Sequence, residues 1–124
     1  MNISLLLGVG LAFLGVVLGA FGAHALKDKF PEPKYEQHWN TAVQYHIYHA
    51  LGLIAIGILS MDALVGESSL LTWACYLMFT GVIFFSGSLY VLSVTGVKKL
   101  GAITPIGGLL FLVAWALVAI EVIN

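Results

Sequence analysis

Residues 68 to 97 read SSLLTWACYLMFTGVIFFSGSLYVLSVTGV and contain no Asp, Glu, Lys or Arg. An α-helix crosses a hydrocarbon core of about 30 Å with about 20 apolar residues, and a charge within that core is costly. Three other stretches are also uncharged and long enough to cross: residues 1 to 26, 37 to 61 and 100 to 120. The pattern predicts an all-α integral membrane protein with four transmembrane helices in a compact antiparallel bundle.

Composition supports the same fold class. The chain has 124 residues, of which 60% are hydrophobic and 9% are charged, and its mean hydropathy is +1.02. Soluble domains carry about 25% charged residues. Since four spans use most of the chain, we expect one membrane domain over residues 1–124, with spans at approximately 3–25, 38–61, 70–94 and 100–122. The net charge of −1 provides no electrostatic basis for binding nucleic acid.

The lysines predict an orientation in the membrane. The second gap between spans, residues 62 to 67, contains no basic residue. Four crossings place the first and third gaps on the same side, and positively charged loops face the cytoplasm. We therefore expect both termini outside a cell membrane and these loops in the cytoplasm. The first and third gaps hold all five lysines of the chain: Lys27, Lys29, Lys34, Lys98 and Lys99.

Small residues predict where helices approach closely. In the first span, Ala12, Gly15, Gly19 and Ala23 share one face, and Gly15-x-x-x-Gly19 is a pattern that brings backbones together. These faces serve packing within one protomer or a contact between copies. Because four short spans enclose little interior, we expect a homo-oligomer in the lipid bilayer. The other predicted packing glycines are Gly22, Gly87, Gly107 and Gly108.

Two further features mark the spans. Trp39 and Trp73 are predicted to anchor the helices at opposite membrane interfaces, where indole rings are enriched. Pro105, within residues 104 to 108, predicts a kink or a wide first turn in the fourth span.

Uncharged polar residues gather in the half of the spans next to the lysine-bearing loops. Polar groups in hydrocarbon need bonding partners or water. This distribution predicts a polar pocket that opens toward the cytoplasm and is closed on the outer side by apolar residues. The candidates for ligand binding or for a transport pathway are His24, Gln44, Tyr45, His46, His49, Ser86, Ser88, Tyr90 and Thr104.

The histidines leave four interpretations open. His46 and His49 are neighbours on a helix, and His24 lies at the same predicted depth. They form hydrogen bonds that join helices, or they handle protons or a small solute, since imidazole titrates near neutral pH. Metal binding by these three residues is a third interpretation, although no carboxylate or Cys shares their depth. Haem or quinone binding is the fourth, and no cofactor is indicated over the others.

Nothing in the sequence supports an enzyme. The chain has no carboxylate pair within the membrane, no G-x-S-x-G motif and no phosphate-binding loop. We therefore expect a protein without catalytic activity.

Four ordered blocks resemble a known family. They are GAFGAHAL at 19 to 26, QYH at 44 to 46 with HAL at 49 to 51, SGSLY at 86 to 90, and ITPIGG at 103 to 108. The chain resembles the bacterial membrane proteins catalogued as domain of unknown function 423, whose eukaryotic relatives are similar to transmembrane protein 256. The resemblance implies a multi-pass protein of a bacterial inner or plasma membrane, and it carries over no established activity.

Two classes of function remain on this reading. In the first, the protein binds a lipid or small-molecule ligand, or acts as a structural accessory factor, through the cytoplasm-facing His/Tyr/Ser pocket. In the alternative, it is a transporter or channel for protons or a small solute. The apolar outer half of the spans weighs against an open pore.

Overall fold

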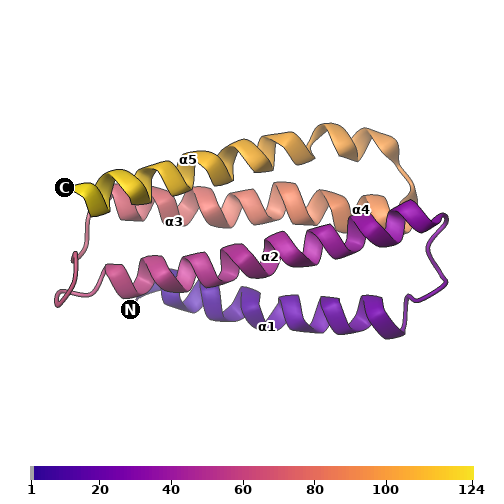
Figure 1. Cartoon of the computed structure of the whole chain (residues 1–124), viewed down its shortest axis with the longest axis horizontal. Coiled ribbons are helices and arrows are strands. Elements are labelled where there is room, and N and C mark those ends of the chain that lie inside the picture. Colours follow the sequence, from indigo (N-terminus) through magenta and orange to yellow (C-terminus); the bar gives the residue numbers. More distant parts are fainter. Residues whose placement is uncertain (1) are drawn as a thin grey trace.

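Long antiparallel helices make up the protein (Figure 1). The computed structural model describes residues 2–124, and four helical segments within them are long and apolar enough to cross a membrane. The predicted all-α membrane fold is thus confirmed. The elements are α1 (Ile3–His24), α2 (Pro33–Leu59), α3 (Ser69–Val82), a π-helix η1 (Ile83–Gly87), α4 (Ser88–Thr95), a 3₁₀-helix η2 (Lys98–Ala102) and α5 (Thr104–Ile123).

Local sequence explains where several helices begin and end. The side chains of Asn2 and Ser68 accept hydrogen bonds from backbone N–H groups in the first turns of α1 and α3. These caps satisfy donors that a helix start leaves unpaired. Pro33 occupies the first turn of α2, where its missing N–H has no cost. Gly96 ends α4 with a φ of 72°, a left-handed conformation that favours glycine.

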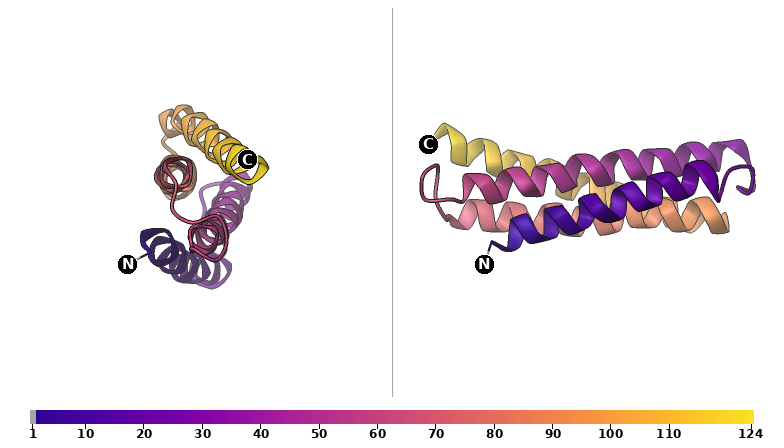
Figure 2. Two further views of the ribbon diagram at one scale, coloured as in Figure 1. Left: turned by 90° about the vertical axis from the view of Figure 1, so that its left-hand side faces the viewer. Right: turned by 90° about the horizontal axis from the view of Figure 1, so that it is seen from below.

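Of the four spans, α2 and the α3–α4 segment lie inside the bundle, and α1 and α5 lie on its outer sides. α1 packs against α2, and α5 packs against α3, while α2 also contacts α3 and α4. Figure 2 shows this zigzag arrangement from the end of the molecule. In the most apolar part of each span, 17% of the residues are buried in α1 and in the segment that ends with α5, compared with 44% in α2 and in the α3–α4 segment. α1 and α5 therefore present most of their surface to the surroundings.

A seam of glycines joins α1 to α2. Gly8, Gly15 and Gly22 recur at seven-residue spacing and are all buried. A Cβ atom at Gly22 would overlap the Trp39 indole, and one at Gly15 would lie 2.8 Å from Ile47 Cγ1 and 3.2 Å from the His46 ring. Trp39 and His46 are also seven residues apart, so large side chains on α2 face glycines on α1. A seven-residue period is typical of helices that pack with a small left-handed crossing.

This seam differs from the predicted face of α1. Gly19 lies near it, since an added Cβ would be 3.2 Å from Val43, but Ala23 is exposed and Ala12 is only partly buried. At about 100° per residue, Ala12 and Ala23 lie about 60° and 80° around the helix from Gly15, whereas Gly8 and Gly22 each lie within about 20° of it. Trp39 also differs from its predicted role as an interfacial anchor, because the seam buries it to 5% exposure, while Trp73 is 62% exposed.

The second close contact joins α5 to the π-helix. A Cβ atom at Gly107 would overlap the backbone of Phe85 within η1, so the two helices meet at this glycine. Gly81 allows a similar approach to the Phe111 ring. The irregular backbone lies in η1 and η2 rather than inside α5, because Pro105 occupies the first turn of α5. The sequence predicted a kink or a wide first turn near Pro105, whereas the irregular segment that precedes α5 is the 3₁₀-helix η2, which is tighter than an α-helix. The π-helix was not predicted.

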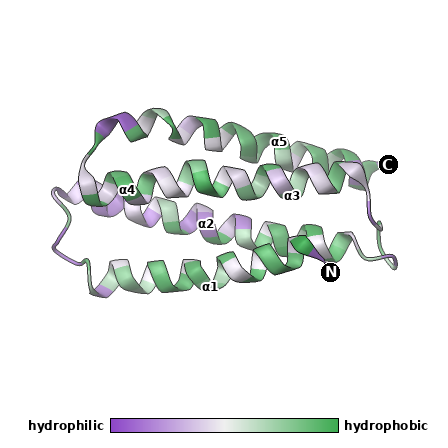
Figure 3. Ribbon diagram, turned by 180° about the vertical axis from the view of Figure 1, so that it is seen from behind, coloured by the Kyte–Doolittle hydropathy of each residue, from purple (hydrophilic) through white to green (hydrophobic). Residues whose placement is uncertain are grey.

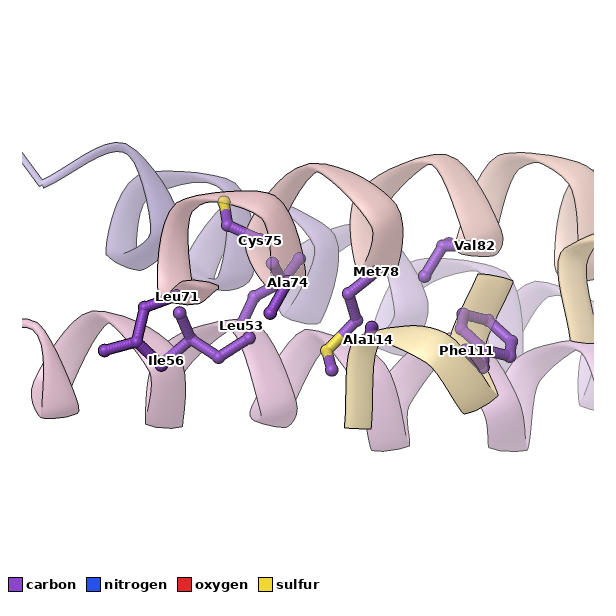
Figure 4. Close-up of a cluster of buried hydrophobic side chains, with 9 residues drawn as sticks. All are labelled: Leu53, Ile56, Leu71, Ala74, Cys75, Met78, Val82, Phe111 and Ala114. Atoms are coloured by element: carbon purple, nitrogen blue, oxygen red, sulfur yellow. The ribbon is translucent and has the colours of Figure 1, made fainter. Parts of the chain in front are cut away.

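The two ends of the bundle have different interiors. Figure 3 shows that the hydrophilic residues of α2 gather in its half next to α4. Toward the opposite end, apolar side chains from α2, α3 and α5 form the main core (Figure 4). This core includes Leu53, Ile56, Leu71, Ala74, Cys75, Met78, Val82, Phe111 and Ala114.

The glycine seam predicts a matched pair of stability effects. We expect Gly22→Ala to destabilise the fold by about 1–3 kcal/mol, because the added methyl group overpacks against Trp39. Gly10→Ala, in the same helix, should be neutral or slightly stabilising, since its Cβ would meet no atom within 4 Å. Thermal unfolding in a mild detergent measures both. Equal melting temperatures for the two variants would contradict the seam.

Candidate functional site

His46 ties three helices together. From α2, its Nε2 atom lies 2.8 Å from the Leu11 carbonyl oxygen of α1, and its Nδ1 atom lies 2.9 Å from the Tyr90 hydroxyl of α4. A carbonyl oxygen only accepts, so Nε2 carries the proton in this contact. In the neutral ring, Nδ1 then accepts a hydrogen bond from the Tyr90 hydroxyl. The side chain is only 2% exposed.

Glycine makes the His46 contact with the α1 backbone accessible. A helical side chain covers the turn that precedes it, so the missing side chain of Gly15 uncovers the Leu11 carbonyl four residues earlier. Trp39 makes an equivalent contact seven residues earlier in α2. Its indole N–H donates to the Leu18 carbonyl at 3.0 Å, and Leu18 lies four residues before Gly22. These bonds supplement the packing between α1 and α2 with specific polar contacts.

His49 joins α2 to α5 with the opposite tautomer. Its Nδ1 atom donates to the Tyr45 carbonyl at 2.7 Å, and its Nε2 atom accepts from the Trp115 indole N–H at 3.0 Å. The ring also stacks on Phe111, with centroids 3.5 Å apart and planes within 6°. Since one nitrogen donates and the other accepts, this imidazole is neutral in the observed geometry.

Three hydroxyl groups continue the polar contacts. Ser86 in η1 donates to the Ala42 carbonyl of α2 at 2.7 Å. Ser88 lies 2.6 Å from the Thr104 hydroxyl of α5 and also contacts the Phe85 carbonyl of η1 at 2.9 Å. Within residues 2–124, every buried side-chain nitrogen or oxygen has a hydrogen-bond partner. The interior polar groups are therefore satisfied by the chain itself.

The other predicted site residues lie outside these contacts or at their edge. Tyr45 is 38% exposed, and its ring packs against Phe85 at a centroid distance of 4.7 Å. Gln44 and His24 are exposed, and His24 is the last residue of α1. Side-chain hydrogen bonds join two pairs of the nine predicted ligand or pathway residues, His46 with Tyr90 and Ser88 with Thr104. His49 and Ser86 instead bond to Trp115 and to the Ala42 carbonyl on neighbouring helices, which were not predicted.

The predicted packing glycines divide into two groups. Gly15, Gly19, Gly22 and Gly107 each face another helix at a distance that leaves little or no room for a methyl group. In contrast, a Cβ at Gly87 would meet no atom within 4 Å, and one at Gly108 would lie 3.9 Å from the Phe85 ring.

Two hollows of the protein lie away from these polar contacts. A cleft of about 370 Å³ opens at the end of the bundle where α1 and α3 begin and α2 ends, far from the lysine-bearing loops. A smaller hollow of about 160 Å³ lies against the α1–α2 connection. None of the nine predicted ligand or pathway residues lines either one. Among residues 2–124, no three His, Cys, Asp or Glu side chains are grouped so that they could hold a metal ion.

The residues that sequence reasoning missed are the partners of the histidines. Trp115 and Phe111 hold His49, and the Leu11 carbonyl holds His46. A backbone acceptor leaves no trace in residue type, so Leu11 had no signal of its own. The seven-residue spacing of the buried glycines was the signal available for the seam, and it was present in the sequence.

Together the helices and their internal bonds define a small multi-pass membrane protein of the α-helical class. The chain belongs to the family described as "Protein of unknown function (DUF423)", which it matches over residues 18–108. It is 50% identical to the UPF0382 membrane protein YwdK of Bacillus subtilis (strain 168), covering 100% of this chain and 98% of that protein. It is 48% identical to the UPF0382 membrane protein SH2409 of Staphylococcus haemolyticus, covering 98% and 95%. No solved structure matches this chain.

The His49 contact predicts a specific cost of removing one N–H group. We expect Trp115→Phe to lower the free energy of unfolding by about 1–3 kcal/mol, because the buried Nε2 atom of His49 loses its donor. The matched control is Trp73→Phe, which removes an indole that is 62% exposed and should change stability little. Thermal unfolding in detergent compares the two, and a larger loss in the Trp73 variant would refute the assignment.

Proposed function

We propose that this protein is an accessory membrane protein that acts by binding a lipid or small-molecule ligand, and that its histidines brace the helices. One observation carries the structural part of the proposal: both ring nitrogens of His46 and both of His49 have partners within the chain. A brace needs saturated bonds between helices. A transport pathway or a ligand site built on these two histidines would need ring nitrogens that are open to an incoming species.

The geometry around His49 weighs against proton transfer. Adding a proton to Nε2 would set its N–H against the indole N–H of Trp115, and two donors cannot bond to each other. Proton uptake would therefore require the α2–α5 contact to open. The Phe111 ring that stacks on the imidazole has no oxygen or nitrogen that could accept a hydrogen bond from the added N–H group.

The same bonds weigh against haem or metal ligation. An imidazole binds a metal through the lone pair of an unprotonated nitrogen. That lone pair accepts the Tyr90 hydroxyl in neutral His46 and the Trp115 indole in His49. Each ligation would cost an interhelical hydrogen bond.

The exposed outer helices suit an accessory role within the bilayer. α1 and α5 lie at opposite edges of the zigzag and leave most of their apolar residues uncovered by this chain. These surfaces contact lipid or further protein, and we retain the homo-oligomer as a prediction. Size measurement of the detergent-solubilised protein by native mass spectrometry tests it.

The function is tested by flux and by retained mass in parallel. In proteoliposomes with an imposed pH gradient, we expect proton flux no faster than in protein-free liposomes. Native mass spectrometry of the same purified protein should detect a discrete lipid or small-molecule mass, retained equally by His46→Gln. A proton flux that is lost in the His46→Gln variant and kept in the His24→Gln variant would contradict the proposal. The absence of any retained lipid or small-molecule mass in every detergent would also contradict it.

We further propose that both termini face the outside of the cell. All five lysines lie at the end formed by the α1–α2 connection and η2, and positive loops stay in the cytoplasm. In a Cys75→Ser background, an impermeant thiol reagent added to intact cells should label Asn124→Cys and leave Lys29→Cys unlabelled. The reverse labelling pattern would overturn the orientation.

A further inference from the structure

The cleft of about 370 Å³ has an apolar floor and a polar rim. Ile56, Leu71 and Cys75 line it and belong to the main core, and we call these three residues its floor. The rim is formed by polar residues at the beginnings of α1 and α3, the end of α2 and the α2–α3 connection. Its volume lies within the range of about 300–1,000 Å³ that small-ligand sites occupy. The cleft therefore has room for a small amphiphilic group.

Three of the hydroxyl groups that line the cleft already donate their protons to backbone carbonyls. Ser4 donates to the Leu53 carbonyl at 2.6 Å, Ser60 to the Ile56 carbonyl at 2.8 Å, and Thr72 to the Ser68 carbonyl at 3.0 Å. A hydroxyl group has one proton and two lone pairs. With each proton directed into a backbone carbonyl, these oxygens can offer only lone pairs to a ligand.

A negative charge completes this acceptor set. The Glu67 carboxylate lies on the rim of the cleft, in the connection between α2 and α3. Within residues 2–124, the charged side chains at this end of the bundle are Asp62, Glu67 and Glu121, and all are acidic. The complementary ligand is a cation that donates several hydrogen bonds.

We propose that this cleft binds a primary ammonium group with a short apolar part, carried either by a lipid headgroup or by a free amine. The ammonium pairs with Glu67 and donates to the oxygens of Ser60 and Thr72, while its carbon chain lies on the apolar floor. A bare metal ion fits less well, because the cleft supplies one carboxylate and a volume far larger than an ion needs. This inference rests on the proposed binding function and assigns its site and ligand class.

The test uses the full chain in nanodiscs of phosphatidylglycerol that contain a minor share of phosphatidylethanolamine. Native mass spectrometry after release should detect retained phosphatidylethanolamine on the unmodified protein and on Asp62→Asn, which removes an acid from the same connection but outside the cleft. We expect Glu67→Gln to retain at least about tenfold less, since hydrogen bonds to a charged group contribute about 1.5–3 kcal/mol and 1.4 kcal/mol is tenfold. Unchanged thermal unfolding of Glu67→Gln verifies that it is folded.

Two further arms separate the sources of the ammonium. Phosphatidylcholine has a charged headgroup without N–H donors. Weaker retention of this lipid than of phosphatidylethanolamine supports the role of the hydroxyl oxygens, and equal retention of the two lipids refutes it. Hexylamine is the free-amine probe: binding that depends on Glu67, without retention of phosphatidylethanolamine, assigns the site to a soluble amine. If neither probe binds in a Glu67-dependent way, the inference is wrong. That result would leave the proposed accessory function standing, because the accessory function is decided by proton flux and by the mass that the His46→Gln variant retains.

Discussion

The close approach of α1 to α2 through glycine is the constraint on which the other contacts depend. Where Gly15 and Gly22 leave the helix surface bare, α2 inserts His46 and Trp39 and reaches backbone carbonyls of α1. Helices in a bilayer gain little from the hydrophobic effect, so close packing and polar bonds must hold them together. Because His46 also contacts Tyr90, the position of α1 is linked through α2 to α4.

The hydrogen bonds of His46 and His49 affect what these residues indicate about function, because all four ring nitrogens already have partners within the chain. Ionisable residues within a membrane suggest a pathway or a cofactor when their polar atoms are open. Here each imidazole is neutral and donates one hydrogen bond to a backbone carbonyl while it accepts another from a side chain. The donating nitrogen is Nε2 in His46 and Nδ1 in His49. Such matching specifies which helices pair and in which register, which is the role of a structural element.

The two ends of the bundle have separate chemistry. The end with the lysines holds the polar interior, where side chains bond to each other and to the backbone. The opposite end holds the apolar core and the larger cleft, whose charged neighbour is Glu67. An interior that is fully bonded supports a rigid scaffold, and the ammonium site that we propose lies at the acidic end rather than at the histidines.

The sequence by itself determined the helical class, the number of spans and the separation of charge between the ends, because the cost of placing a charge in hydrocarbon depends on where charged residues fall along the chain. It also placed His46 and His49 in the polar half. Only the tertiary structure decided that α1 packs through Gly8, Gly15 and Gly22, that Trp115 holds His49, and that the cleft lies away from both histidines. The physical reason is that a helix face, a tautomer and a cavity are each defined by the partner across an interface, and residue spacing within one helix does not identify that partner.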